Sequence, residues 1–99
     1  MATIKKLTNT DVTKQLLKIS GWNVNTKMTE LSKSFEVPTF VTGLALAAKI
    51  AVHAEVMGHH PIVELSAEKI KVKLTTHDVK GLSKLDFDLA RRIDGLNPV

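Results

Sequence analysis

Two stretches near the ends of the chain share one pattern of apolar and polar positions. In each, an apolar residue precedes a hydroxyl residue, an acid follows three positions later, and a second apolar residue comes next: Leu7, Thr8, Asp11 and Val12, and Leu82, Ser83, Asp86 and Phe87. Such a capping box with a hydrophobic staple marks a helix N-terminus, because its side chains bond free N–H groups of the first turn. The pattern predicts helices from about Asn9 to Ile19 and from about Lys84 to Asp94.

A longer apolar stretch lies between these two segments. Pro38 suits the start of a helix and Gly58 suits the left-handed position after its end, so a helix is expected from about Pro38 to Met57. Its residues are apolar around most of the circumference. We therefore expect it to be the central and most buried helix.

Alternating residues predict the strands. Ile70, Val72 and Leu74 alternate with three lysines, which is the period of a strand with one buried face. The other strand candidates are 22–25, 31–37 and 63–65. The resulting order, α-β-β-α-β-β-α, predicts an α+β two-layer sandwich, in which a four-stranded antiparallel sheet has three helices packed on one face. All 99 residues fit a single domain.

Composition and charge narrow the possible functions. The absence of cysteine excludes thiolate chemistry and disulfides. The formal net charge of +4 is modest, and one Trp and three Phe are the only aromatic residues. Nucleic-acid binding, for which Lys69, Lys71 and Lys73 are the candidates, is therefore not expected. Charged residues interrupt the apolar stretch 40–57 and no secretory signal precedes it, so we expect a cytoplasmic protein without a membrane span.

Three of the four histidines lie around one predicted hairpin. His59 and His60 directly follow the central helix, and His77 lies just past the lysine-rich strand. Because the start of one hairpin strand lies beside the end of the other, these histidines are expected at the same end of the sheet. Glu55 lies one turn before His59, and Asp86 follows nine residues after His77. Imidazole titrates near neutral pH, so the cluster indicates proton transfer by half-exposed histidines.

Several of these residues also have a structural explanation. His59 at a helix C-terminus favours the helix dipole, Asp86 is the capping acid of its own helix, and Trp22 is typical of a core anchor. Three histidines with a carboxylate could bind zinc, although adjacent histidines on an extended chain diverge. His53, on nearly the opposite side of its helix from Glu55, is assigned to packing or surface. A Ser–His–Asp hydrolase is not expected, because no serine lies in a G-x-S-x-G turn.

At these residues the sequence resembles the pterin-4a-carbinolamine dehydratase family. The resemblance rests on Glu55-Val56-Met57-Gly58-His59-His60-Pro61, Leu74-Thr75-Thr76-His77-Asp78, Gly81-Leu82-Ser83 with Asp86, and the Gly21-Trp22 pair. It spans about 16–93. The chain departs from the family at Ile62, where an acid often follows the proline, and at Ala67, where an aromatic residue is common. Both departures bear on substrate affinity rather than on acid–base chemistry.

The resemblance implies the fold order given above and dehydration of a 4a-hydroxytetrahydropterin to the quinonoid dihydropterin, which recycles a pterin cofactor. That step needs no metal, cofactor or covalent intermediate. It also implies these roles: His59 and His77 as acids toward the departing hydroxyl, His60 in pterin binding and proton removal, Glu55 and Asp86 in orienting the imidazoles, and Trp22 and Thr76 in substrate contact. The family further implies a homodimer or homotetramer. The alternative is a non-catalytic protein-binding or transcription-coactivator module with a regulatory protein partner.

Overall fold

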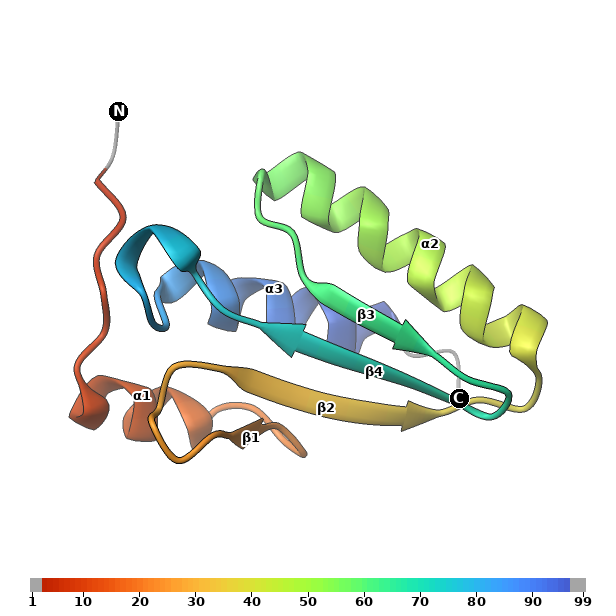
Figure 1. Ribbon diagram of the computed structural model, residues 1–99, viewed down its shortest axis with the longest axis horizontal. Coiled ribbons are helices and arrows are strands. Elements are labelled where there is room, and N and C mark those ends of the chain that lie inside the picture. Colours follow the sequence, from red (N-terminus) through yellow and green to blue (C-terminus); the bar gives the residue numbers. More distant parts are fainter. Residues whose placement is uncertain (1–2, 97–99) are drawn as a thin grey trace.

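The computed structural model describes residues 3–96, which form a sheet layer and a helix layer (Figure 1). The elements follow in the order α1 (Asn9–Leu16), β1 (Asn23–Val24), β2 (Leu31–Glu36), α2 (Phe40–Met57), β3 (Ile62–Leu65), β4 (Lys69–Leu74), a 3-10 helix η1 (His77–Val79) and α3 (Lys84–Leu96). The predicted α+β class and α-β-β-α-β-β-α order are confirmed, and η1 is an addition that the sequence pattern did not predict.

The sheet has strand order β1-β2-β4-β3, and every neighbouring pair is antiparallel. Along β4 the apolar side chains of Ile70, Val72 and Leu74 have no solvent exposure, because they point toward the helices. The intervening lysines lie on the open face of the sheet. This alternation confirms the strand predicted from its period of two.

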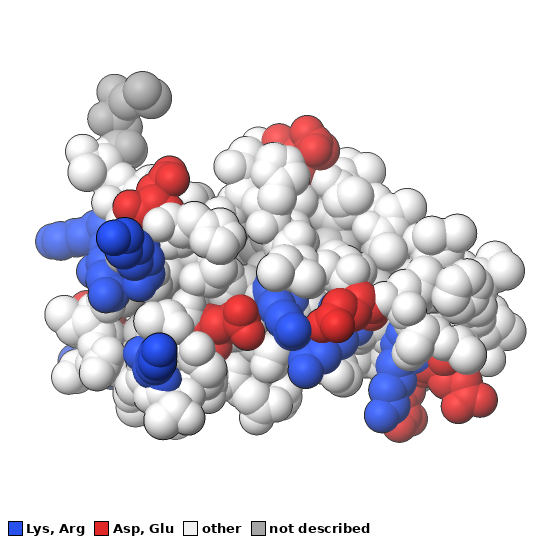
Figure 2. Space-filling view, in the orientation of Figure 1, with Lys and Arg blue, Asp and Glu red and all other residues white. Residues whose placement is uncertain are grey.

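Acids interleave with the lysines on the open face of the sheet. Lys69 pairs in register with Glu36, and Lys73 Nζ lies 3.0 Å from Glu64 Oε1 across strands β4 and β3. This hydrogen bond lowers the pKa of Glu64 and raises the pKa of Lys73. Figure 2 shows blue and red side chains side by side over this part of the molecule. The face is therefore not uniformly basic.

The ends of α1 follow local rules. Thr8 Oγ1 accepts the Asp11 N–H at 3.1 Å, and the Asp11 carboxylate accepts the Thr8 N–H in return, so the predicted capping box is present. The helix ends at Leu16, three residues before the predicted end at Ile19. The N–H groups of Lys18 and Ile19 instead bond carbonyls three residues back, which tightens the chain into a turn.

Helix α2 is the element whose burial the sequence did not predict. Its buried residues are Gly43, Leu46, Ile50 and Ala54. Its outer face is defined by the side chains of Phe40, Val41, Leu44, Val52 and Val56, all of which are exposed to solvent. The prediction that this helix is the most buried is wrong, because apolar composition does not say which side of a helix the rest of the chain covers. By length and composition alone α2 could also cross a membrane.

Candidate active site

A left-handed glycine lies between helix α2 and the first two histidines of the cluster. Gly58 has φ +63° and ends α2, with its N–H bonded to the carbonyls of Ala54 and Glu55. The chain then leaves the helix extended, so that successive side chains point to opposite sides. His59 is 8% exposed and points into the protein, whereas His60 points outward. The expected divergence of the two adjacent histidines is observed.

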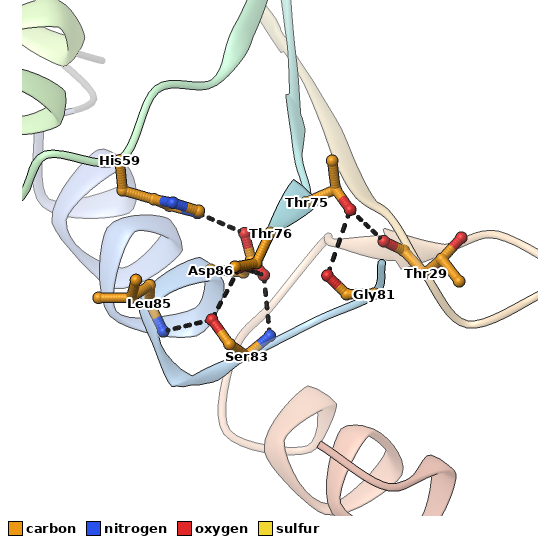
Figure 3. A network of polar contacts seen from close by, with 8 residues as sticks. All are labelled: Thr29, His59, Thr75, Thr76, Gly81, Ser83, Leu85 and Asp86. Carbon is orange, nitrogen blue, oxygen red and sulfur yellow. Dashed lines mark hydrogen bonds and ion pairs between the residues drawn. The ribbon is translucent and has the colours of Figure 1, made fainter. Parts of the chain in front are cut away.

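The His59 ring is held by a buried carboxylate from α3. His59 Nε2 lies 2.6 Å from Asp86 Oδ1, and Asp86 has no solvent exposure. The other carboxylate oxygen accepts hydrogen bonds from the Thr76 hydroxyl at 2.7 Å and from the Ser83 N–H at 2.9 Å. Thr76 and Ser83 also share a hydrogen bond between their hydroxyls at 2.7 Å. Figure 3 shows these groups converging on Asp86.

This network fixes which nitrogen of His59 is available. An ionised carboxylate only accepts hydrogen bonds, so Nε2 of His59 carries the proton that it donates to Asp86. The Nδ1 nitrogen is then left to exchange a proton with a bound molecule. Because Asp86 also satisfies the capping N–H of Ser83, one carboxylate both starts α3 and orients the histidine.

The three predicted histidines line a single cavity of about 210 Å³. His60 Nε2 lies 3.0 Å from Glu55 Oε1, and both side chains are largely exposed. His77 is exposed at the start of η1. It is distant in sequence from the end of α2, but it lines the same cavity as the two histidines that follow that helix. None of the three histidines is half-exposed, contrary to the expectation. His59 is buried, whereas His60 and His77 are open to solvent.

Two residues expected to contact substrate have other partners. The Trp22 indole N–H is bonded to the Asp94 carboxylate at 3.0 Å, and its ring packs edge-on against Phe35 at 6.3 Å. It is 7% exposed and does not line the histidine cavity. Within this chain it therefore acts as a core anchor, the alternative role that the sequence offered. Thr76 does line the cavity, but its hydroxyl is engaged by Asp86 and Ser83. Its role here is to position Asp86.

Sequence reasoning missed several residues that line the cavity or support it. Ile4, Thr75, Asp78 and Leu85 line it, and Ser83 was read only as a helix cap. Only Ser83 carried a usable signal, since a capping box whose acid is buried can serve a site as well as a helix. Ile4 reaches the cavity through long-range packing that local periodicity does not report.

The fourth histidine lies elsewhere, as expected. His53 is half-buried against α3, with Nδ1 3.5 Å from Arg92 Nη1. Within residues 3–96, no group of three or more His, Asp or Glu side chains is arranged to hold a metal ion.

Comparison with known proteins decides the family. The family model described as pterin 4 alpha carbinolamine dehydratase matches residues 5–96. The chain belongs to the pterin 4 alpha carbinolamine dehydratase family. A relative from Roseiflexus sp. (strain RS-1) is 37% identical over 90% of this chain and 94% of its own length. One from Sulfurisphaera tokodaii is 37% identical over 94% and 98%. Both are provisionally assigned as pterin-4-alpha-carbinolamine dehydratases.

Solved structures of the dehydratase fold agree with the architecture. A protein from Brucella melitensis, described as a transcriptional coactivator/pterin dehydratase, superposes with a TM-score of 0.89 at 27% identity, over 94% of this chain and 99% of that one. A pterin dehydratase-like protein described as a RuBisCO assembly factor in the alpha-carboxysome superposes with a TM-score of 0.68 at 22% identity, over 79% and 90%. The second likeness concerns the fold alone.

Proposed function

We propose that this protein dehydrates a 4a-hydroxytetrahydropterin to the quinonoid dihydropterin. The observation that carries the proposal is one cavity lined by His59, His60 and His77, in which a buried carboxylate orients His59. Membership of the pterin 4 alpha carbinolamine dehydratase family supports the substrate class. Imidazoles supply and remove protons near neutral pH without a cofactor.

The reaction breaks the bond between C4a and its hydroxyl oxygen and forms a double bond from C4a to the neighbouring ring nitrogen. A proton must therefore reach the leaving hydroxyl, and another must leave that nitrogen. His59 and His77 act as acids toward the hydroxyl, and the hydrogen bond to Asp86 holds the His59 ring in place. His60, paired with Glu55, assists pterin binding and accepts the proton from nitrogen.

A timed dehydration assay tests the proposal. Purified protein is added to chemically generated 4a-hydroxytetrahydropterin, and the loss of its absorbance is followed. We expect the rate to rise in proportion to protein concentration. A rate equal to that without protein would refute the dehydratase proposal.

A chelator series tests whether the histidines move protons or hold a metal. A histidine that exchanges protons must keep a nitrogen free, so EDTA or phenanthroline is expected to leave turnover unchanged. Loss of activity with chelator and its return with zinc would replace the acid–base account with a metal site.

A protein-binding role is the second candidate, and the outer face of α2 favours it. Five large apolar side chains are exposed together on one helix, an arrangement that marks interaction surfaces in soluble proteins. The Brucella relative described as a coactivator is consistent with such a role. A protein that fails the dehydration assay but binds a different protein through this face would support the binding function instead.

A further inference from the structure

A larger cavity lies next to the histidine cavity, on the side of the N-terminal segment. It measures about 410 Å³ and is lined by Thr3, Ile4, Lys5, Leu7, Ser83, Lys84 and Leu85. Ile4 and Leu85 line both cavities, so the two are neighbours that share these walls. The histidine cavity alone, at about 210 Å³, is smaller than the roughly 300–1,000 Å³ of typical ligand sites. A pterin ring with a long substituent would need both.

The N-terminal segment that walls this cavity is anchored. The Leu7 N–H bonds the Leu82 carbonyl at 2.8 Å, which ties the segment to the start of α3. The Lys6 side chain lies against Gly81, so close that a Cβ there would come within 2.7 Å of it. Figure 1 shows the segment descending beside η1 and the beginning of α3. Lys6 and Leu7 are thus tied to the start of α3, and Ile4, two residues before Lys6, lines the histidine cavity.

Basic side chains are among the residues that line the apolar cavity. Lys5 and Lys84 line it, and Lys84 also lines a third cavity of about 280 Å³ together with Lys18 and Arg91. Arg91 is fixed by hydrogen bonds to Asp88 and Gln15 at 3.1 and 2.9 Å. Among the described residues, no Asp or Glu lines either cavity.

We propose that the site accepts a pterin whose substituent passes Ile4 and Leu85 into the apolar cavity and ends in an anionic group beside Lys84. The substrate class is then a pterin with an apolar or aromatic spacer and a terminal carboxylate or phosphate. This inference rests on the proposed function, because it requires the pterin ring to occupy the histidine cavity. Ile4 and Lys84 become specificity-determining residues without any part in proton transfer.

Calorimetric titration with two stable ligands tests the inference. 6-Methylpterin and folic acid carry the same oxidised pterin ring, and folic acid adds an aromatic spacer that ends in carboxylates. We expect folic acid to bind about tenfold more tightly, as one well-placed charged contact allows. The Lys84→Glu and Ile4→Ala variants should each reduce this ratio toward one. Glutamate suits the first turn of α3, so Lys84→Glu is expected to fold.

Lys71→Glu is the matched control. It makes the same charge change on the open face of the sheet and lines none of these cavities, so the ratio should stay at its wild-type value. If both ligands bind equally to the wild type, or if Lys84→Glu leaves the ratio unchanged, the substituent subsite is wrong while the dehydratase proposal stands. If neither ligand binds and the dehydration assay also fails, the dehydratase proposal and this inference fall together.

Discussion

Asp86 is the residue on which most of the candidate site converges. A carboxylate with no solvent exposure is unfavourable unless its oxygens are bonded, and here they accept hydrogen bonds from an imidazole, a hydroxyl and a backbone N–H. Glu55 makes the same kind of contact with His60, but both side chains of that pair are exposed to water. The two acid–histidine pairs therefore differ in how firmly they hold the ring.

Asp86→Asn is expected to impair both folding and turnover. The amide would present an N–H group either to the His59 Nε2–H or to the donors at Thr76 and Ser83, leaving one buried donor unsatisfied. The free energy of unfolding should fall by about 1–3 kcal/mol, and the His59 ring should change its tautomer, which nitrogen-15 NMR detects. Denaturant unfolding measures the first effect.

Glu55→Gln makes the same chemical change at the exposed pair and serves as the control. Exposed ion pairs contribute little to folding, so its unfolding midpoint should match that of the wild type. Equal losses of unfolding free energy in the two variants would mean that the buried network around Asp86 stabilises the fold no more than the exposed pair does.

At the scale of elements, the sequence predicted those features that depend only on residues close together in the chain. The capping box at Thr8, the alternation along β4 and the glycine after α2 each appear where the sequence placed them. The burial of α2 could not be predicted in the same way. Its apolar residues cover nearly all of the circumference, so the pattern does not reveal that only one side meets the sheet and α3.

The exposed outer face of α2 predicts self-association. A homodimer or homotetramer would cover Val41, Val52 and their apolar neighbours. Introducing charge there with Val41→Glu and Val52→Glu together is expected to shift the wild-type assembly to single chains in analytical sedimentation. Helical content should be retained, because neither side chain belongs to the core. A wild type that sediments only as a monomer at micromolar concentration contradicts this prediction.

At the scale of the whole molecule, the site is assembled from parts of the chain that no local motif connects. His59 comes from the end of α2, His77 from η1, Asp86 from α3 and Ile4 from the N-terminal segment. The hairpin argument brought the histidines together correctly. It could not separate a buried His59 from an exposed His77, because exposure depends on how α3 packs behind the hairpin. The sequence left Trp22 either in the core or at the substrate, and it could not decide between them because the partner Asp94 is distant in sequence.

The central claim is that proton transfer occurs at this cluster, and His77 tests it most cleanly. His77 is exposed, so its removal disturbs no buried contact, whereas His59→Ala would leave the buried Oδ1 oxygen of Asp86 without its histidine partner. The measurement is timed dehydration of 4a-hydroxytetrahydropterin by His77→Ala and His53→Ala, each checked for an unchanged fold. We predict that His77→Ala slows turnover by about 10²–10⁴-fold, the usual contribution of a positioned acid or base. His53→Ala removes a half-buried side chain beside Arg92, away from the histidine cavity, and should keep wild-type turnover. Equal turnover in the two variants would contradict the account.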